Sequence, residues 1–453
     1  MSSKSSTGGR ARDRATAAVR RLRARSGRPV GHGLRLRRAA RGRAATREAL
    51  RSGAGGALRR APRGEARADR SGVWRYRELI APHLAPEEML ARGEGNTGLY
   101  ASRPLAEWVG LSGDLWIKHE GENPTASFKD RGLCVAVSLA RRADCRVLAC
   151  ASTGNTSSSL ASYAALAGLP CVVFVPAGKI STGKLAQTLA YGARVLEVEG
   201  SFDEAMRLVE EAAEAFGLGL LNSVNPWRIE GQKSIALELL DELDWEAPDW
   251  IVLPSGNLGN ISALGKALRE AHAAGLIDRL PRIAGVQAAG AAPFARLVAA
   301  RRENAAAELL PELAPETLAT AIRIGKPRSW RKALREVEAL DGEVLALPDE
   351  ELLDAKAAID AAGIGCEPAS AAAVAGVRRL VAEGKIERGA RVASILTGHL
   401  LKDPDLTARL HDGSLPGVPA PRPRARRRVA SSLDALREAL ADLLGRAPPP
   451  PLR

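Results

Sequence analysis

From Leu115 onward, short apolar runs alternate along the chain with longer amphipathic stretches. The amphipathic stretches, such as 202–216 and 229–243, carry apolar residues at i, i+3, i+4 and i+7, the spacing of one helix face. Strands that alternate with helices are joined by right-handed crossovers, so they lie parallel in a sheet with helices on both faces. The sequence therefore predicts an α/β fold with mostly parallel sheets. The expected strands are 115–118, 147–151, 171–175, 195–198, 218–221, 250–253, 283–286 and 392–396.

The positive charge of the chain is concentrated at its N-terminus. The formal net charge is +14, whereas residues 1–70 alone carry +17 and the remainder carries −3. The N-terminal segment consists mostly of Arg, Ala, Gly and Ser, so it cannot bury enough apolar surface to fold by itself. We predict a disordered, Arg-rich extension over residues 1–71. Electrostatic binding of nucleic acid by this tail is the less favoured interpretation.

The composition argues against a membrane protein and against a metal site. With 45% hydrophobic and 26% charged residues, the chain has the makeup of a globular protein. Its longest apolar runs, such as 171–176, fall far short of the roughly 20 residues that cross a bilayer. The five cysteines form no CxxC pair, and the six histidines are scattered. We expect unpaired, buried cysteines in a reducing cytoplasm and no bound metal.

The C-terminal region, 415–453, begins with a linker rich in Pro and Arg over 416–428. A short helix is expected after it, because Ser431-x-x-Asp434 has the pattern of a capping box. Four leucines then recur on one stripe of that helix. We interpret the helix as docking on its own subunit, with partner binding as the less favoured alternative. The leucines are Leu433, Leu436, Leu440 and Leu443.

Lys129 follows a polar loop and begins a helical pattern. Ser127 followed by Asp130 predicts a capping box, which places Lys129 in the first turn of a helix. There the positive end of the helix dipole disfavours an ammonium group, and the neutral amine is the form that makes a Schiff base. An exposed lysine beside Asp130 explains the same residues equally well, so this loop alone leaves both interpretations open.

The segment 151–159 directly follows the expected strand 147–151, and seven of its nine residues are Ser, Thr or Asn. Hydroxyl and backbone N–H groups at the start of a helix suit an anion such as a carboxylate. A helix cap needs only one such residue. An anion-binding site is therefore the favoured interpretation.

Two further loops follow expected strands. The loop 254–260 contains two glycines that allow the backbone to fold around a phosphate, and Thr397 places a neutral hydroxyl after strand 392–396. Each of these is by itself explained by an ordinary turn or strand end. Ligands of parallel sheets collect at the carboxyl ends of the strands. The loops together predict a site for pyridoxal 5′-phosphate (PLP) bound to an amino acid: an amine, a phosphate cradle, a carboxylate pocket and a neutral partner for a ring nitrogen.

These segments resemble the threonine synthase family, within the tryptophan-synthase-β-like, fold-type II PLP-dependent enzymes. The resemblance covers about residues 74–404, and the motifs occur in the same order along the chain. They are Gly93-Glu94-Gly95-Asn96-Thr97, Ser127-Phe128-Lys129-Asp130-Arg131-Gly132, Ser152-Thr153-Gly154-Asn155-Thr156, Gly256-Asn257-Leu258-Gly259-Asn260, Glu367-Pro368-Ala369-Ser370 and Thr397-Gly398-His399.

The resemblance implies a two-domain fold with PLP in the cleft between the domains. The large PLP-binding domain is expected over 72–145 and 193–414, with a smaller mobile domain, 146–192, inserted in it. Lys129 is the expected catalytic residue that forms the Schiff base, Asn155 is expected to contact the phenolic oxygen of PLP, and Thr397 its pyridine nitrogen. The expected cofactor-binding residues are Lys129, Asn155, Gly256, Asn257, Leu258, Gly259, Asn260 and Thr397. The expected substrate-binding residues are Ser152, Thr153, Thr156, Ser223 and Arg228.

The reaction that the resemblance implies converts O-phospho-L-homoserine and water to L-threonine and phosphate, in threonine biosynthesis, by a cytoplasmic enzyme expected to be a homodimer. The rival interpretation within the superfamily is another PLP lyase, either a serine/threonine dehydratase or a phospholyase. Arg228 disfavours a dehydratase, which has no substrate phosphate to neutralise. A nucleic-acid-associated protein built on an inactive scaffold is disfavoured because Lys129, Asn155 and Thr397 are all present.

Three departures from the family pattern involve four positions. Gly98 stands where a proline is usual, and we expect it to loosen a loop on the substrate side. Lys326 and Arg328 stand where Asn and Val are more common and add positive charge. Leu400 replaces a common glycine after His399.

Overall fold

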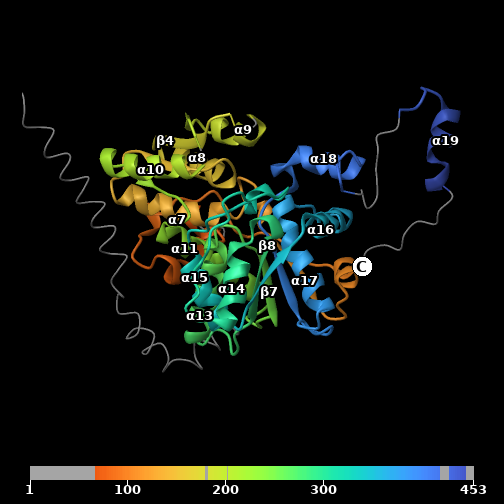
Figure 1. Cartoon of the computed structure of the whole chain (residues 1–453). Coiled ribbons are helices and arrows are strands. Elements are labelled where there is room, and N and C mark those ends of the chain that lie inside the picture. The colour runs from red at the N-terminus through yellow and green to blue at the C-terminus, as the bar shows by residue number, and fades with distance from the viewer. Residues whose placement is uncertain (1–66, 179–181, 201, 419–427, 445–453) are drawn as a thin grey trace, which may run out of the picture. The chain divides into compact units, whose positions relative to one another are not determined.

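The computed structural model describes residues 67–178, 182–200, 202–418 and 428–444 of the 453-residue chain (Figure 1). The chain divides into two compact units, Met1–Pro404 and Asp405–Arg453. Residues 1–66 of the predicted extension and residues 419–427 of the predicted linker lie outside the described residues. Within the predicted extension, Arg67–Arg70 form the 3₁₀ helix η3 and Ser71 is buried.

The larger sheet has six strands in the order β1-β2-β10-β7-β8-β9. Five of them are parallel, and β1 runs antiparallel to β2 at one edge. The mostly parallel sheet predicted from the alternating pattern is confirmed, while β1 and β9 were not predicted. The strands are β1 Leu99–Ala101, β2 Leu115–His119, β7 Trp250–Pro254, β8 Arg282–Ala288, β9 Glu343–Leu347 and β10 Val392–Leu396.

Both faces of this sheet are buried under helices. Along β7, Ile251 and Leu253 belong to one hydrophobic core together with residues of α7, α12, α13, α14 and α15. Trp250 and Val252 alternate with them and belong to a second core with residues of α6, α16 and α17. Figure 1 shows α16 and α17 on the opposite side of β7 and β8 from α13 and α15. The near-continuous apolar runs of the sequence follow from this burial on two sides.

The helices of the first unit that do not cover the smaller sheet are bounded as follows. They are α5 Arg77–Ile80, α6 Arg103–Val109, α7 Lys129–Arg142, α11 Pro226–Gln232, α12 Ser234–Glu242, α13 Gly259–Ala273, α14 Pro293–Glu303, α15 Trp330–Ala339, α16 Asp349–Ala361 and α17 Ala372–Ala382. The 3₁₀ helices besides η3 are η4 Trp74–Tyr76, η5 Pro86–Glu88, η6 Glu120–Glu122, η7 Ala289–Ala291, η8 Thr320–Ile322, η9 Pro368–Ala371 and η10 Leu400–Lys402.

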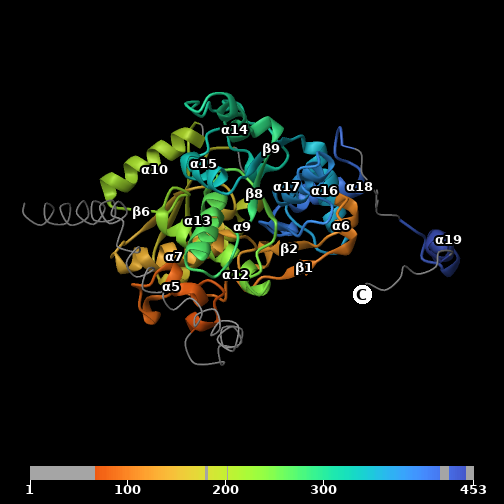
Figure 2. The ribbon, with the colours of Figure 1, turned by 90° about the horizontal axis from the view of Figure 1, so that it is seen from below.

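The smaller sheet has four parallel strands in the order β5-β4-β3-β6. Its face toward α10 (Phe202–Phe216) forms a separate small core, and Figure 2 shows α10 beside β6. Its other face packs with α8 (Asn155–Ala167) and α9 (Thr182–Ala190) into the core of α7. The sheet continues past residue 192, the boundary predicted for a mobile domain, and the mobility of that domain stays a prediction. The strands are β3 Leu148–Ala151, β4 Cys171–Pro176, β5 Arg194–Val198 and β6 Gly219–Leu220.

Helices α7 and α11 cross unusually closely, because each has a glycine at the crossing. A Cβ on Gly231 would lie 2.1 Å from the carbonyl oxygen of Arg131, and one on Gly132 would lie 2.9 Å from the carbonyl oxygen of Arg228. No side chain fits at such distances, so the two backbones touch. The crossing fixes Lys129, at the start of α7, relative to Arg228 on α11.

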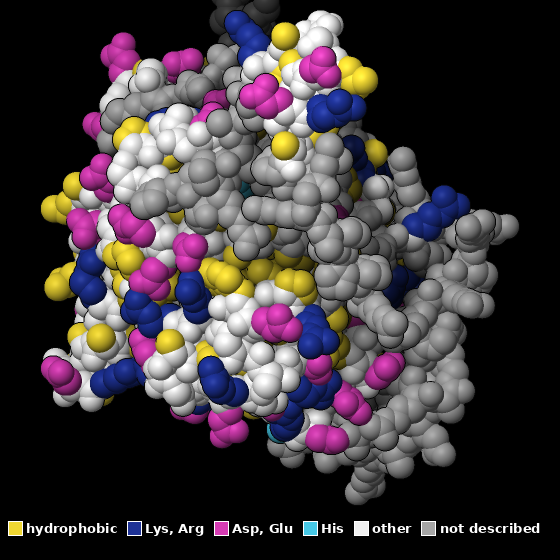
Figure 3. Space-filling model, turned by 90° about the vertical axis from the view of Figure 1, so that its right-hand side faces the viewer, with side chains coloured by type: hydrophobic (Ala, Val, Ile, Leu, Met, Phe, Trp, Pro, Cys, Tyr) yellow, Lys and Arg dark blue, Asp and Glu magenta, His cyan; other side chains and the backbone are white. Residues whose placement is uncertain are grey.

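The second unit contains α19 (Leu433–Leu444), and α18 (Pro404–Asp412) begins at the boundary between the units. The hydroxyl of Ser432 accepts a hydrogen bond from the N–H of Ala435 at 3.2 Å. The cap is therefore one residue beyond the predicted Ser431, because α19 begins at Leu433. Among the described residues no helix is long and apolar enough to cross a membrane. Acidic and basic side chains are interspersed over the described face in Figure 3.

Candidate active site

The carboxyl ends of β2, β7 and β10 bring the predicted loops to one edge of the larger sheet. β10 lies between β2 and β7, and Leu396 pairs with His119 at its end. Just beyond, the N–H of Phe128 donates to the carbonyl oxygen of Thr397 at 3.0 Å, and Ser127 forms a bridge with Gly398. The Lys129 loop and the Thr397 loop are therefore hydrogen-bonded to each other, although 268 residues separate them in the sequence.

Lys129 is the first residue of α7, which confirms its expected place in the first turn. Removal of the amine from water and, to a lesser extent, the nearby positive charge of Arg228 together lower the pKa of Lys129 to about 7, while Glu367 opposes both effects. An ordinary lysine is almost entirely protonated at neutral pH. The lowered pKa makes the neutral amine, which is the nucleophilic form, far more populated near neutral pH than in an ordinary lysine.

Asp130 organises the loop before Lys129, but not as the predicted capping box. Its carboxylate accepts hydrogen bonds from the N–H and the hydroxyl of Thr125, both at 2.6 Å, and from the hydroxyl of Ser159 at 2.5 Å. The hydroxyl of Ser127 has no partner among the described residues. The expected cap at Ser127 is therefore wrong, because α7 begins after Phe128 and Asp130 turns back to hold the loop. Burial raises the pKa of Asp130 to about 6, against the effect of these hydrogen bonds.

Glu367 links Asn155 with Thr397, the two residues expected to contact the cofactor ring. The side-chain amide of Asn155 donates to the two carboxylate oxygens at 3.0 and 3.2 Å, and the hydroxyl of Thr397 lies 3.4 Å from one of them. Burial raises the pKa of Glu367, against the effects of the Asn155 hydrogen bond and the charges of Lys402 and Lys129. The motif Glu367-Pro368-Ala369-Ser370 does not by itself indicate a role for Glu367. Only its nearness to Asn155, 212 residues away, reveals one.

The residues Gly256, Asn257, Leu258, Gly259 and Asn260 form the turn from β7 into α13. Leu258 has a φ of 66°, and α13 starts at the next residue. A Cβ on Gly256 would lie 3.2 Å from the Cα of Ile322, so the turn has little room for a side chain there. Both polar atoms of the buried Asn260 side chain, and the hydroxyl of Ser255, have no partner among the described residues. A bound phosphate accepts hydrogen bonds, so it could satisfy the two donors among these groups, the Asn260 amide NH2 and the Ser255 hydroxyl, together with N–H groups at the start of α13.

Arg228 lies on α11 with only 1% of its surface exposed. One terminal nitrogen of its guanidinium donates to the carbonyl oxygen of Leu221 at 3.1 Å, and the other donates to the hydroxyl of Thr156 at 3.4 Å. Its Nε has no hydrogen-bond partner, and no carboxylate lies within ion-pair distance among the described residues. Burial lowers the pKa of Arg228 to about 10, with Cys150 opposing. A buried cation without a counter-ion is costly, so this site is built for an anion.

The other expected substrate residues lie at the half-buried start of α8 and after β6. Ser152 accepts a hydrogen bond from the N–H of Gly154 at 3.3 Å, and Thr153 follows it before α8 begins. Ser223 is half-buried, and its carbonyl oxygen would be 3.9 Å from a Cβ placed on Gly259. The structure thus places Ser223 beside the expected phosphate turn. Among the predicted site residues, Thr156 is hydrogen-bonded to Arg228, and Asn155 and Thr397 both contact the carboxylate of Glu367.

Known proteins resemble the chain over this same region. A family model described as pyridoxal-phosphate dependent enzyme matches residues 90–398. The threonine synthase of Methanocaldococcus jannaschii is 46% identical over 339 residues, covering 75% of this chain and 82% of that protein. The threonine synthase of Mycobacterium leprae is 48% identical over 335 residues, covering 74% of this chain and 88% of that protein. The chain belongs to the threonine synthase family. It is therefore a PLP-dependent lyase, as the motifs predicted.

A solved structure supports the fold of this threonine synthase family member. Maize serine racemase matches with a TM-score of 0.60 and 20% identity, covering 76% of this chain and 97% of that one. At this identity the likeness concerns the fold alone. It confirms the fold-type II arrangement of mostly parallel sheets with helices on both faces.

The residues of the site fit PLP. A lysine with a lowered pKa can hold the aldehyde carbon, and the turn at Gly256 with its unsatisfied donors can hold the phosphate. Asn155 and Thr397 supply neutral hydrogen-bonding groups on either side of Glu367. Among the described residues, no group of three His, Cys, Asp or Glu residues could hold a metal ion.

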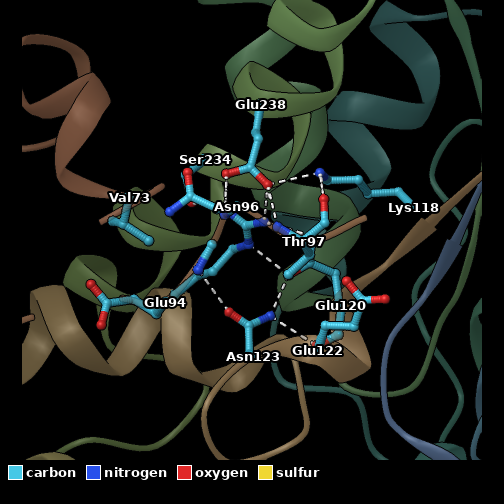
Figure 4. A network of polar contacts seen from close by, with 12 residues as sticks. Val73, Glu94, Asn96, Thr97, Lys118, Glu120, Glu122, Asn123, Ser234 and Glu238 are labelled. Atoms are coloured by element: carbon cyan, nitrogen blue, oxygen red, sulfur yellow. Dashed lines mark hydrogen bonds and ion pairs between the residues drawn. The ribbon is translucent and has the colours of Figure 1, made fainter. Parts of the chain in front are cut away.

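A buried network of charged side chains holds α7, the helix that begins at Lys129, through Arg131. Arg131 pairs with Glu120 and with Glu238, and Lys118 pairs with Glu238 at 2.7 Å; all four side chains are fully buried. Burial by itself would raise the pKa of Glu238, but the charges of Arg131 and Lys118 outweigh it and hold the pKa well below its usual range. Figure 4 shows Glu238 reaching the segment of Thr97, whose N–H donates to it at 3.1 Å.

Replacing Glu238 with alanine is expected to lower the free energy of unfolding by about 3 kcal/mol, the low end for breaking a buried ion pair. Arg131 and Lys118 would lose their shared partner and keep only Glu120 and Glu242 as charged partners among the described residues. Denaturant unfolding measures this change. Glu107→Ala is the matched control, since Glu107 pairs with Arg103 on the surface of α6 and should cost about 1 kcal/mol or less. Equal losses in the two variants would contradict a structural role for the network.

Gly98 and Arg328, two departures from the family pattern, have structural reasons. The ring of Tyr100 covers Gly98, 2.5 Å from where a Cβ would be, and the N–H of Gly98 donates to Glu122 at 2.6 Å. A proline would clash with the ring and remove this hydrogen bond. The N–H of Arg328 donates to the side chain of Asn257 at 3.4 Å. Its guanidinium lies 3.7 Å from Glu210 on α10, so Arg328 joins the phosphate turn to a helix of the smaller sheet.

The leucine at position 400, where the family more often has glycine, is explained by its neighbour Gly365. Nothing in the structure explains the lysine at position 326. A Cβ on Gly365 would lie 2.5 Å from the side chain of Leu400. Gly365 has a φ of 72°, a conformation that glycine adopts without strain. Gly365, which has no side chain, therefore leaves room for Leu400, which is larger than the glycine that is common at this position.

Proposed function

We propose that this chain converts O-phospho-L-homoserine and water to L-threonine and phosphate. The single observation that carries the proposal, beyond family membership, is Arg228: a guanidinium buried in the site with no carboxylate partner among the described residues. A substrate phosphate supplies the missing negative charge. A planar guanidinium also matches a phosphate with two parallel hydrogen bonds.

In this proposal Lys129 would hold PLP and Thr397 would face its ring nitrogen. PLP, when bound, supplies an electron sink that stabilises negative charge on carbons next to the substrate amine. Lys129 is the residue that moves protons. Because its pKa lies near 7, its amine is able both to accept a proton from the substrate α carbon and to return one at neutral pH. Its place at the start of α7 keeps it close to Arg228 through the tight crossing of α7 with α11.

The substrate is held at both ends in this proposal. Thr156 and Arg228 hold the phosphate, which leaves from the γ carbon, with Ser223 nearby. Ser152 and Thr153 hold the substrate carboxylate with the N–H groups at the start of α8. Departure of the phosphate develops negative charge against a cation that water does not reach, and electrostatic stabilisation is strong in such surroundings.

The experiment that tests the proposal is incubation of the purified protein, loaded with PLP, with O-phospho-L-homoserine. We expect threonine and phosphate to appear in equal amounts. Phosphate released without threonine would indicate a phospholyase. A keto acid formed from serine or threonine, without turnover of the phosphorylated substrate, would indicate a dehydratase.

The remaining parts of the proposal are a homodimer, a cytoplasmic location and a cleft for PLP between the two sheets with a smaller mobile domain. All five cysteines are unpaired, as a reducing compartment leaves them. Residues 1–66 of the basic N-terminal extension that suggested nucleic-acid binding lie outside the described residues. The near-balanced charge over the rest of the chain favours a small-molecule substrate over nucleic acid.

A further inference from the structure

Ser370 is fully buried and contacts Thr397 through its hydroxyl group. Its hydroxyl oxygen accepts hydrogen bonds from two successive backbone N–H groups, those of Thr397 and Gly398, each at 2.9 Å. The same oxygen lies 2.9 Å from the hydroxyl oxygen of Thr397. Ser370 belongs to η9, so this contact joins η9 to the end of β10.

The direction of the hydrogen bond between the two hydroxyls follows from counting donors and acceptors. A serine hydroxyl has two lone pairs and one proton. The two N–H groups occupy both lone pairs, so Ser370 has only its proton to offer. The carbonyl oxygen of Gly398 is 3.5 Å away, beyond the ordinary range for a hydroxyl donor, whereas Thr397 is within it. Ser370 therefore donates and Thr397 accepts.

This leaves the proton of Thr397 available for another acceptor. The carboxylate of Glu367 is 3.4 Å from the Thr397 hydroxyl, longer than the 2.5–3.0 Å of a well-formed bond between hydroxyl and carboxylate. Glu367 is also engaged by the amide of Asn155. The Thr397 proton is thus left for an acceptor in the site, because its remaining acceptor among the described residues is Glu367 at 3.4 Å.

We infer that Ser370 is a positioning residue that makes the Thr397 hydroxyl a hydrogen-bond donor to the pyridine nitrogen of PLP, so that this nitrogen is held without a proton. The inference rests on the proposed function, which puts the ring nitrogen at Thr397. A protonated nitrogen would meet a second donor and lose the hydrogen bond. Ser370 therefore limits how strongly the ring withdraws electrons, although it does not touch the cofactor.

The test uses the holoenzyme loaded with PLP that carries ¹⁵N in the ring, observed by NMR without turnover. In the wild type we expect the resonance of an unprotonated, hydrogen-bonded pyridine nitrogen across the neutral pH range. Thr397→Val should move the resonance toward that of a free pyridine, and Ser370→Ala should move it in the same direction. Ser370→Cys, which nearly keeps the volume and offers a weaker donor, should give an intermediate shift and serves if the alanine variant does not fold.

The affinity for PLP provides the second measurement. Losing one neutral hydrogen bond should raise the dissociation constant about 3- to 10-fold in either single variant. If Ser370 acts through Thr397, the double variant should bind PLP little worse than Thr397→Val alone. Ser394→Ala is the matched control, because Ser394 is a fully buried serine on β10 whose hydroxyl has no partner among the described residues. It should leave the resonance unchanged.

The outcomes separate the inference from the proposed function. A protonated nitrogen in the wild type would overturn the inference, and so would an unchanged resonance in both Ser370 variants while Thr397→Val shifts it. Fully additive losses of affinity would assign Ser370 a purely structural role. If Thr397→Val leaves the resonance in place, the ring nitrogen is not at Thr397, and that part of the proposed function fails first.

Discussion

Replacing Lys129 with alanine is expected to give a folded protein that holds no covalently attached cofactor and has lost at least ~10³-fold in turnover, because one residue serves as both the attachment point and the proton carrier. The fold should survive. The Lys129 amine is removed from water and its ammonium form is disfavoured in the folded protein, so alanine removes an unfavourable group. Visible absorbance of the bound cofactor, measured after gel filtration, reports the attachment.

Borohydride treatment followed by peptide mapping identifies the attached residue in the wild type. We expect the reduced cofactor on the peptide that contains Lys129 and on no peptide of the Lys129→Ala protein. Lys332→Ala on α15 is the control, since partial burial lowers the pKa of that lysine as well, whereas its charged neighbours are Arg335, Lys266 and Glu230. Cofactor fixed on a different lysine, with the absorbance retained in Lys129→Ala, would move the attachment point and refute the assignment.

Arg228→Ala is expected to lower kcat/KM for O-phospho-L-homoserine by on the order of 100-fold or more, the usual loss when one charge-stabilising donor is removed. Arg228→Lys should recover only part of this, because an ammonium group does not make the two parallel hydrogen bonds of a guanidinium. The absorbance of the bound cofactor should survive in both variants, since Arg228 contacts Leu221 and Thr156 and not the turn at Gly256.

Thermal unfolding supplies a readout of the anion site that does not depend on turnover. Inorganic phosphate should raise the Tm of the wild type by mass action and should raise that of Arg228→Ala much less. Without phosphate, Arg228→Ala should be at least as stable as the wild type, because a buried cation without a counter-ion has been removed. Arg207→Ala, on the exposed face of α10, is the control and should keep the phosphate effect. Near-wild-type kinetics in Arg228→Ala would remove it from the site.

The sequence was sufficient for the elements whose hydrophobic pattern is unambiguous. β10 was predicted with its observed bounds, Val392–Leu396, because all five residues are apolar or small and buried. Eight of the ten strands that the structure describes, all except β1 and β9, overlap the apolar runs from which strands were predicted. β1 and β9 escaped prediction because both lie at edges of the larger sheet, where burial on one side leaves mixed, partly exposed patterns.

Helix ends were less predictable than helix positions. α10 has its predicted bounds, whereas the predicted helix 229–243 begins earlier, at Pro226, and is divided at Lys233. The capping boxes at Ser127 and Ser431 fit the local pattern but did not form. Asp130 bonds to Thr125 and Ser159 instead. A capping pattern is short, and a tertiary partner that supplies a better hydrogen bond overrides it.

The sequence by itself determined the chemistry of the site, because Lys129, Asn155, the turn at Gly256 and Thr397 each stand at the end of a strand or the start of a helix, and parallel sheets gather such positions. Tertiary structure alone decided how these groups are tuned. The lowered pKa of Lys129 comes from burial and from Arg228, which is brought near by the glycine crossing of α7 with α11. The donor direction of Thr397 comes from Ser370. Burial and hydrogen-bond direction depend on residues distant in the chain, and no local pattern encodes them.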